Sequence, residues 1–354
     1  MNENTKFEFL RIIVAIMIAI LVTFIAILFV SDEPITAIMK LLFGPFKSIR
    51  TFGNVIELMT PLMFAGLGML VVFSSKQFNL SADGAFHIGG LIAAILAIKV
   101  SLPFIIHPIF ALLIAGIAGV VITLIPFLIK HKTGANDFVV SLMLNYVCVL
   151  LATYIVLNYF RDPTQGTFAT EIFKETSKIG ILFPNTKIHM GFVIAIVFVI
   201  IIEIFLNRTT IGLKIRTTGD NLSYSKYIGF NTFKIILITQ IVGGFILGIG
   251  GGIEVLGMYN KFTWQSSMGF GWDGVIVSIL AKNKPKFIPL AAFFLAYLRI
   301  GAYVMAMSTD VQNEIIYVAQ GMIIILVIGE KFLGRYKNRR LYKTAKMKLE
   351  GGEL

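Results

Sequence analysis

The chain has 354 residues, of which 57% are apolar and 14% are charged, and its formal net charge is +12. A mean hydropathy of +0.86 excludes an ordinary soluble domain. The positive charge does not indicate nucleic-acid binding, because Lys and Arg gather between long apolar runs, as they do in the cytoplasmic segments of membrane proteins. We therefore expect this chain to lie in a lipid membrane, and we do not expect it to bind nucleic acid.

Nine apolar runs are long enough to predict membrane-spanning helices, because a helix crosses the hydrocarbon core with about 20 residues. In chain order the runs are Ile12–Val30, Ile56–Phe73, Gly84–Ile98, Pro108–Ile129, Phe138–Asn158, Ile188–Leu206, Phe233–Val255, Phe287–Met307 and Asn313–Lys331. A shorter run, Gly274–Ala281, predicts a short or half-inserted helix. The predicted fold class is all-α, a polytopic transmembrane helical bundle of about ten segments in a single domain over residues 1–354.

The distribution of Lys and Arg predicts the orientation. With ten crossings and both termini in the cytoplasm, most of these residues lie inside, including the basic tail at about 331–354. Nine crossings place that tail outside, so we count the short run as a crossing. The first apolar run follows Lys6 and Arg11 and lacks a small-residue cleavage site, which predicts an uncleaved anchor.

Cysteine and histidine give no sign of a metal site. Cys148 is the single cysteine, so no disulfide forms within one chain. The four histidines lack the spacing of metal ligands and are interpreted as loop or interface residues; they are His87, His107, His131 and His189. We expect neither a metal nor a cofactor.

The polar segment Lys76–Gly84 interrupts an otherwise continuous apolar region. Asn79, Ser81 and Asp83 alternate with small or apolar residues. Such residues cap helix starts, which favours a cytoplasmic turn. The alternative is a broken helix that borders a translocation path, because irregular backbone at membrane depth survives only beside a cavity or inside protein.

Glycines recur at every fourth position in the run Phe233–Val255. Gly244, Gly248 and Gly252 share one helix face, and we interpret them as helix-packing positions. Glu254 follows them, and a carboxylate there is expected to face a cavity, a cation or the membrane interface.

Both tryptophans of the chain lie in the segment Trp264–Gly274. They are typical of an aromatic belt at the membrane interface. The alternative is a vestibule in which Trp264, Trp272 and Asp273 contact a planar or sugar-like ligand. Both interpretations stay open.

A basic stretch, Arg208–Phe230, separates two apolar runs and contains glycine, asparagine and paired tyrosines. It predicts a short helix that lies against a soluble partner. The chain has no G-x-x-x-x-G-K-[ST] phosphate loop, so any ATP hydrolysis belongs to another protein.

Three segments resemble, in order, the permease subunits of ABC importers for nucleosides and simple sugars. Gln77–Gly84 is similar to their "FNIG-x-EG" segment, and Arg216–Asn231 to their cytoplasmic "RAxGxNxxAAxYxGI" loop. Gly250–Pro285 is similar to their "GxxEVLG…GYGFxGIAVALLGRNNP" run. Asp83-Gly84-Ala85 replaces the usual "EGQ", and Ser223 and Ser225 replace an alanine pair. The nucleoside branch fits better than the ribose branch, whose segment reads "IDLSVG".

The resemblance implies a non-enzymatic transport subunit that moves nucleosides by alternating access through the plasma membrane of a prokaryote. Its implied partners are an ABC ATP-binding subunit, a second permease subunit that is a paralogue, and an extracellular substrate-binding lipoprotein. The implied substrate pathway contains Asn79, Asp83, Glu254, Trp264, Trp272 and Asp273. The implied ATPase-coupling residues are Arg216, Gly219, Asn221, Tyr227 and Gly229.

Two alternatives stay open. One is a simple-sugar permease of the same importer class. The other is an ion-coupled secondary transporter, which needs ionisable residues in the middle of its helices. Glu203, Glu254, Arg299 and Glu314 lie near the predicted span ends, which weighs against ion coupling.

Overall fold

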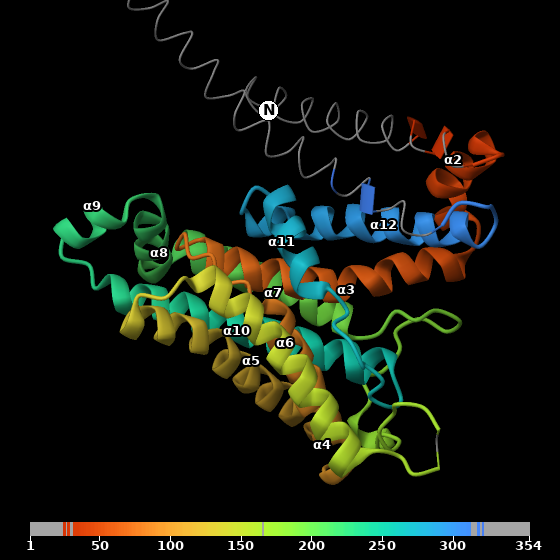
Figure 1. Cartoon of the computed structure of the whole chain (residues 1–354), viewed down its shortest axis with the longest axis horizontal. Helices are drawn as coiled ribbons and strands as arrows, with labels where there is room; N and C mark the ends of the chain where they lie inside the picture. The colour runs from red at the N-terminus through yellow and green to blue at the C-terminus, as the bar shows by residue number, and fades with distance from the viewer. Residues whose placement is uncertain are drawn as a thin grey trace, which may run out of the picture. The chain divides into compact units, whose positions relative to one another are not determined.

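The computed structural model describes residues 24–25, 27–28, 31–164, 166–312, 317–318 and 321 (Figure 1). This part of the chain is built from helices, and its only strand-like pairings are the isolated bridges Arg161–Thr170 and Ile181–His189. It divides into two compact units. One unit is residues 46–297, and the other contains the described parts of 1–45 and 298–354. The single domain expected over residues 1–354 stays a prediction.

The helices follow one another with short connections, except on either side of η3 and before α11. They are α2 (Pro34–Phe43), η1 (Gly44–Phe46), α3 (Ile49–Phe73), α4 (Ala82–Lys99), α5 (Ile106–Thr133), α6 (Asp137–Ile155), η2 (Val156–Phe160), η3 (Glu175–Ser177), α7 (Gly191–Arg208), α8 (Thr210–Asp220), α9 (Leu222–Tyr227), α10 (Thr232–Met258), α11 (Phe270–Leu280), η4 (Pro285–Phe287) and α12 (Ile288–Ala306).

Seven of the described helices are long and apolar enough to cross a membrane. They coincide with seven of the nine expected runs, which confirms the all-α polytopic bundle. The short run expected at Gly274–Ala281 is α11, which begins four residues earlier. The runs Ile12–Val30 and Asn313–Lys331 lie mostly outside the described residues, so the count of about ten crossings stays a prediction.

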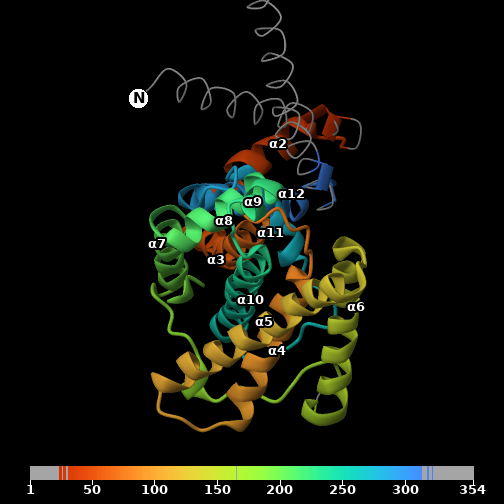
Figure 2. The same ribbon diagram turned by 90° about the vertical axis from the view of Figure 1, so that its left-hand side faces the viewer.

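Helix α10 packs against α3, α4 and α5 (Figure 2). Its glycines allow this close approach. A Cβ on Gly244 would overlap the hydroxyl of Thr123, and one on Gly248 would overlap the carbonyl oxygen of Ala115. Gly252 is less confined, because its nearest neighbour is the side chain of Leu112. The three glycines thus bring α10 against α5 along one face.

The loop between η2 and α7 is hydrogen-bonded to the loop between α10 and α11. The amide of Thr170 donates to the carbonyl of Phe262 at 3.1 Å, and the amide of Phe173 donates to the carbonyl of Asn260 at 2.9 Å. An ion pair joins Lys261 to Asp162 at 2.7 Å. These contacts fix the segment that carries Trp264 across one end of α4.

Candidate functional site

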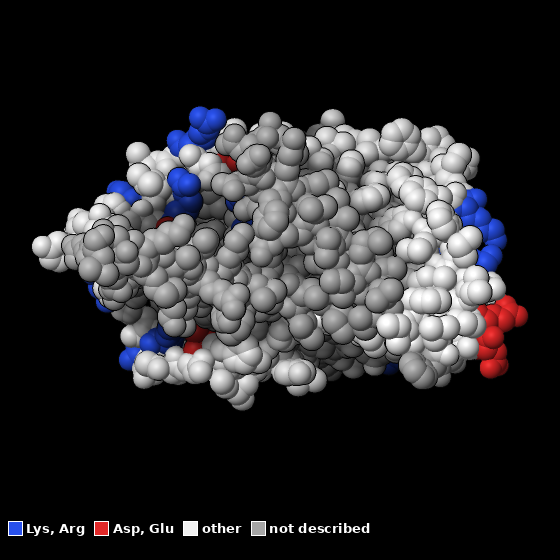
Figure 3. Space-filling view, turned by 90° about the horizontal axis from the view of Figure 1, so that it is seen from above, with Lys and Arg blue, Asp and Glu red and all other residues white. Residues whose placement is uncertain are grey.

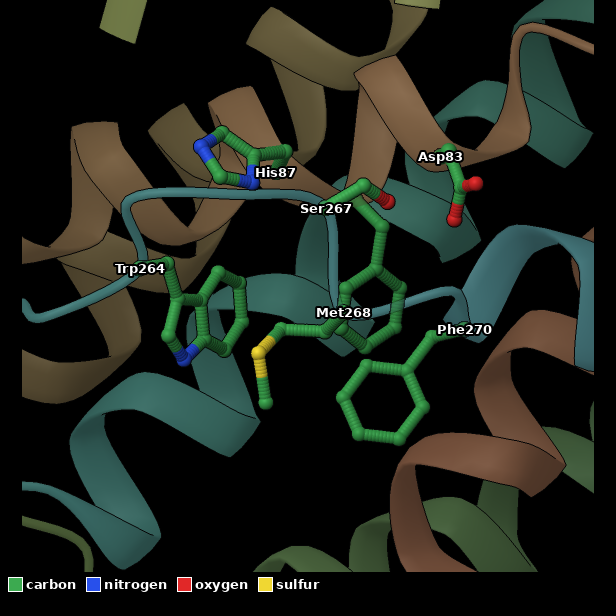
Figure 4. Close-up of a pocket in the computed structure, with 7 residues that line it drawn as sticks. Asp83, His87, Trp264, Ser267, Met268 and Phe270 are labelled. Atoms are coloured by element: carbon green, nitrogen blue, oxygen red, sulfur yellow. The ribbon is translucent and has the colours of Figure 1, made fainter. Parts of the chain in front are cut away.

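A small recess lies between the first turns of α4 and the loop that leads into α11 (Figure 4). Its lining residues are Asp83, Phe86, His87, Trp264, Ser267, Met268 and Phe270. The space between these side chains is too narrow to hold a water molecule. Pockets that hold ligands are usually about 300–1,000 Å³. In this conformation the recess is therefore closed to a nucleoside-sized molecule.

Asp83 links the two elements that form the recess. Its Oδ1 accepts a hydrogen bond from the backbone amide of Gly271 at 2.7 Å, and its carboxylate is also hydrogen-bonded by Ser267. A Cβ on Gly271 would overlap the backbone amide of Asp83, so glycine permits this approach. A carboxylate beside the amide groups at the N-terminus of α11 is electrostatically favourable.

Aromatic rings form one wall of the recess. Phe86 and Trp264 are stacked, with ring centroids 6.1 Å apart and an interplanar angle of 19°. Phe270 lies 5.1 Å from Phe86, and Tyr259 meets Trp264 edge-on at 6.1 Å. Trp264 is only 3% exposed. This buried ring lines the recess, whereas an aromatic belt residue faces the membrane interface.

His87 also lines the recess, although the sequence indicated a loop or interface residue. That interpretation is wrong, since His87 lies within α4 and is 2% exposed. Neither ring nitrogen has a hydrogen-bond partner among the described residues. A buried polar group without a partner costs about 1–3 kcal/mol. No periodicity in the sequence marks this position, because a single imidazole within an apolar helix does not reveal which side of the helix is buried.

Asn79 lies outside the recess, in the irregular segment between α3 and α4. Its Nδ2 donates to the carbonyl of Thr123 and to Oε1 of Gln240, both at 2.8 Å, and its Oδ1 accepts from the amide and hydroxyl of Ser81. Asn79 is 2% exposed. It joins this segment to α5 and α10, and its place in a substrate pathway stays a prediction.

Two polar residues of α6 form hydrogen bonds with the same irregular segment and with the start of α4. The hydroxyl of Ser141 accepts from the amide of Leu80 at 3.0 Å. Asn145 donates to the carbonyl of Leu80 at 2.9 Å and accepts from the amide of Gly84 at 2.9 Å. Sequence reasoning missed both residues. Their four-residue spacing in an apolar run was the available signal, because it places them on one helix face.

Glu254 lies near the end of α10 and is 3% exposed. It lies near Glu57, an acidic residue of α3 that is 8% exposed and that sequence reasoning missed, and the two side chains would repel each other if both were ionised. Lys187 attracts both. Glu254 does not line the recess, and neither does Asp273, buried in the first turn of α11, nor Trp272, which is 48% exposed. Of the predicted pathway residues, the recess brings together Asp83 and Trp264.

The basic stretch forms two helices, α8 and α9, where a single short helix was expected. The chain turns at Asn221, whose side chain caps α9 by accepting from the amide of Tyr224 at 3.0 Å. The turn after α9 uses Gly229 at φ +82°. Arg216 and Tyr227 are exposed, and Tyr227 is 90% exposed. In the view of Figure 3, Lys and Arg side chains are visible on the left, the side on which Figure 1 labels α8 and α9, and further ones are visible on the right.

Helix α8 also contacts the polar segment that leads to the recess. A Cβ on Gly219 would overlap the carbonyl oxygen of Ser74. Lys76 Nζ donates to the carbonyl of Asp220 at 2.8 Å. Residues 74–81 therefore run from α8 at one end to Asp83 and the recess at the other.

Comparison with known proteins identifies the family. The model of the family described as branched-chain amino acid transport system / permease component matches residues 51–328. The chain belongs to this family. It is a permease subunit of an ABC importer and a multi-pass membrane protein, and its resemblance to nucleoside and simple-sugar permeases is confirmed.

Three relatives match most of the chain. The guanosine ABC transporter permease NupP of Bacillus subtilis is 27% identical over 85% of this chain and 87% of its own length. The nucleoside ABC transporter permease NupB of Lactococcus lactis is 26% identical over 94% of this chain and 93% of its own. The glucose ABC transporter permease TsgB13 of Haloferax volcanii is 23% identical over 92% and 88%.

Proposed function

We propose that this permease carries nucleosides into a prokaryotic cell across the plasma membrane. The observation that supports this most is the aromatic wall of Phe86, Trp264 and Phe270 beside the carboxylate of Asp83. A nucleobase offers a flat face for stacking, and its N–H groups suit a carboxylate acceptor. The guanosine and nucleoside permeases among the relatives support the same cargo.

The charge of the recess favours a nucleoside over a nucleotide. Asp83 is the charged residue of its described lining, which contains no Lys or Arg. A phosphate group requires cationic or amide donors, and it would be repelled by this carboxylate.

The power for transport comes, in this proposal, from a separate ABC ATP-binding subunit that contacts α8 and α9. Tyr227 offers an exposed ring for that contact, and Gly219 places α8 against Ser74. Movement of the ATP-binding subunit would pass through residues 74–81 to the start of α4. A paralogous second permease subunit completes the pathway, and an extracellular lipoprotein delivers the nucleoside.

A simple sugar is the second candidate cargo. The glucose permease of Haloferax volcanii supports it, because aromatic rings also stack against sugar rings. Under this alternative Asp83 accepts hydrogen bonds from sugar hydroxyls, and no base is needed.

Uptake by cells with and without the gene separates the two cargoes. Labelled adenosine, uridine, ribose and glucose are supplied singly, and the deletion is complemented with the intact gene. We expect adenosine and uridine uptake to fall on deletion and to return on complementation. If only ribose or glucose uptake depends on the gene, the nucleoside proposal is wrong.

A further inference from the structure

We propose that His87 recognises the edge of the nucleobase during transport, through hydrogen bonds made by its two ring nitrogens. This inference rests on the proposed nucleoside function and concerns the same recess. His87 lies on α4 one turn after Asp83, so the two side chains lie on one face of the helix. Both line the recess, and Figure 4 shows them opposite residues of the loop that leads into α11.

The bonding of His87 differs from that of an equally buried histidine. His107 is 0% exposed, and its Nδ1 and Nε2 pair with the hydroxyl of Thr176 at 2.9 Å and the carbonyl of Leu96 at 3.1 Å. His87 is 2% exposed, and neither of its nitrogens has a partner among the described residues. The buried His189 lies between these two cases, because its Nδ1 accepts from the amide of Gly191 and its Nε2 has no partner among the described residues. Of the three buried imidazoles in the described part of the chain, His87 is the one with both nitrogens unpaired, and it lines the closed recess.

Packing alone does not require a polar ring at position 87. The imidazole meets the ring of Phe262 edge-on, with centroids 5.7 Å apart, and lies 5.7 Å from the ring of Trp264. A phenylalanine suits such surroundings without leaving polar atoms unpaired. Residues that break local packing rules at a cost in stability are expected at functional sites. The polar atoms of His87 therefore have a purpose outside this closed conformation.

The rings that cover His87 belong to a segment that is held by a few polar contacts. Phe262 and Trp264 lie between α10 and α11, in the loop fastened by the Lys261–Asp162 ion pair and the Thr170–Phe262 bonds. Displacement of this loop would expose His87 and break the bond between Ser267 and Asp83, while the backbone hydrogen bonds of α4 stay intact. A base that enters the opened recess stacks on Phe86, and its edge faces His87 and Asp83.

The donor and acceptor pattern fits a nucleobase. A neutral imidazole presents one N–H donor and one nitrogen acceptor, and Asp83 adds a carboxylate acceptor. Purine and pyrimidine bases carry donors and acceptors side by side on a planar edge. The hydroxyls of a free sugar are distributed around a puckered ring. His87 should therefore affect discrimination among bases and leave any ribose uptake unchanged.

Two substitutions of His87 and one matched control test this role in the complete transporter complex. His87→Phe keeps the ring and removes both nitrogens, His87→Gln keeps one donor and one acceptor, and His107→Phe removes a satisfied buried imidazole elsewhere. Uptake of labelled guanosine, adenosine, uridine and ribose is measured together with the thermal unfolding midpoint of the purified complex.

We expect His87→Phe to lower nucleoside uptake at least tenfold while its unfolding midpoint equals or exceeds that of the parent. His87→Gln should retain part of the uptake with a changed ratio among the bases, and His107→Phe should lower the midpoint. Parental uptake and base ratios in a folded His87→Phe complex would overturn the inference. A midpoint loss like that of His107→Phe would equally overturn it by showing a structural role.

The same experiment separates this inference from the proposed function. If the parent complex takes up no nucleoside, the proposed nucleoside function and the proposed role of His87 are both wrong. If the parent takes up nucleosides and His87→Phe does so equally well, the role of His87 alone is wrong.

Discussion

Asp83 Oδ1 accepts a hydrogen bond at 2.7 Å from the backbone amide of Gly271, which lies 188 positions further along the chain. The bond joins the first turn of α4 to the first turn of α11. Both elements contribute to the recess, so the position of one helix start depends on the other.

Removal of the Asp83 carboxylate should loosen this junction. We expect Asp83→Leu to lower the free energy of unfolding by about 1–3 kcal/mol, because the buried amide of Gly271 loses its acceptor. Asp83→Asn keeps an oxygen at the same place and should lose less. Thermal unfolding of the purified complex measures the difference, and equal losses in the two variants would show that the bond to Gly271 is unimportant.

One added methyl group should affect stability differently at two glycines of α10, Gly248 and Gly252. Gly248→Ala places a Cβ against the backbone carbonyl of Ala115, whereas Gly252→Ala meets the movable side chain of Leu112. We expect Gly248→Ala to destabilise the bundle by about 1–3 kcal/mol, as overpacking does, and Gly252→Ala to cost less. Unfolding midpoints of the two variants test this order, and the reverse order would contradict the packing of α10 on α5.

We expect substitutions in α8 and α9 to cause two different defects, one in coupling to the ATP-binding subunit and one in stability. Tyr227→Glu changes an exposed ring, so we expect normal stability with loss of uptake and of stimulated ATP hydrolysis by the partner. Gly219→Glu adds bulk against the carbonyl of Ser74 and should lower both stability and uptake. Membrane yield, unfolding midpoint and ATPase assays separate the two. Full transport by the variant with both changes would disprove the coupling role.

His189 predicts a loss of stability in weak acid. Burial lowers its pKa from 6.5 to about 4. The unfolded chain therefore binds a proton as the pH falls through 6.5, while the folded chain binds it only near pH 4. The folded state should lose about 2–3 kcal/mol across this interval. His189→Asn should flatten that part of the profile of unfolding midpoint against pH, and an unchanged slope would contradict this assignment.

The membrane helices were predictable because each depends on a long apolar run that is visible without tertiary information. The recess was predictable only in part. Asp83 and Trp264 stood out as a carboxylate at a helix start and a rare aromatic residue, but their meeting depends on the path of the α10–α11 loop. Asn79 was expected beside the substrate, and this stays a prediction; its hydrogen bonds to Thr123, Gln240 and Ser81 were not visible in the sequence.

The residues that escaped prediction share a physical cause. They are polar side chains within apolar helices: Ser141, Asn145, Glu57 and His87. The direction in which each one faces depends on neighbours that are distant in sequence. The division of the basic stretch into α8 and α9 was missed for a more local reason. Asn221 caps the second helix and ends the first, a role that its residue type alone permits but does not require.

ATP-driven accumulation in vesicles tests the central claim most directly. The complex that contains this chain is reconstituted in lipid vesicles. ATP is supplied on the side of the membrane that corresponds to the cytoplasm, and the substrate-binding lipoprotein is supplied on the other side. Labelled guanosine, uridine, ribose and glucose are then compared. We predict that the nucleosides move toward the ATP side and that this movement stops when a non-hydrolysable analogue replaces ATP. Movement of sugars alone, or nucleoside movement that follows an ion gradient without ATP, would contradict the account.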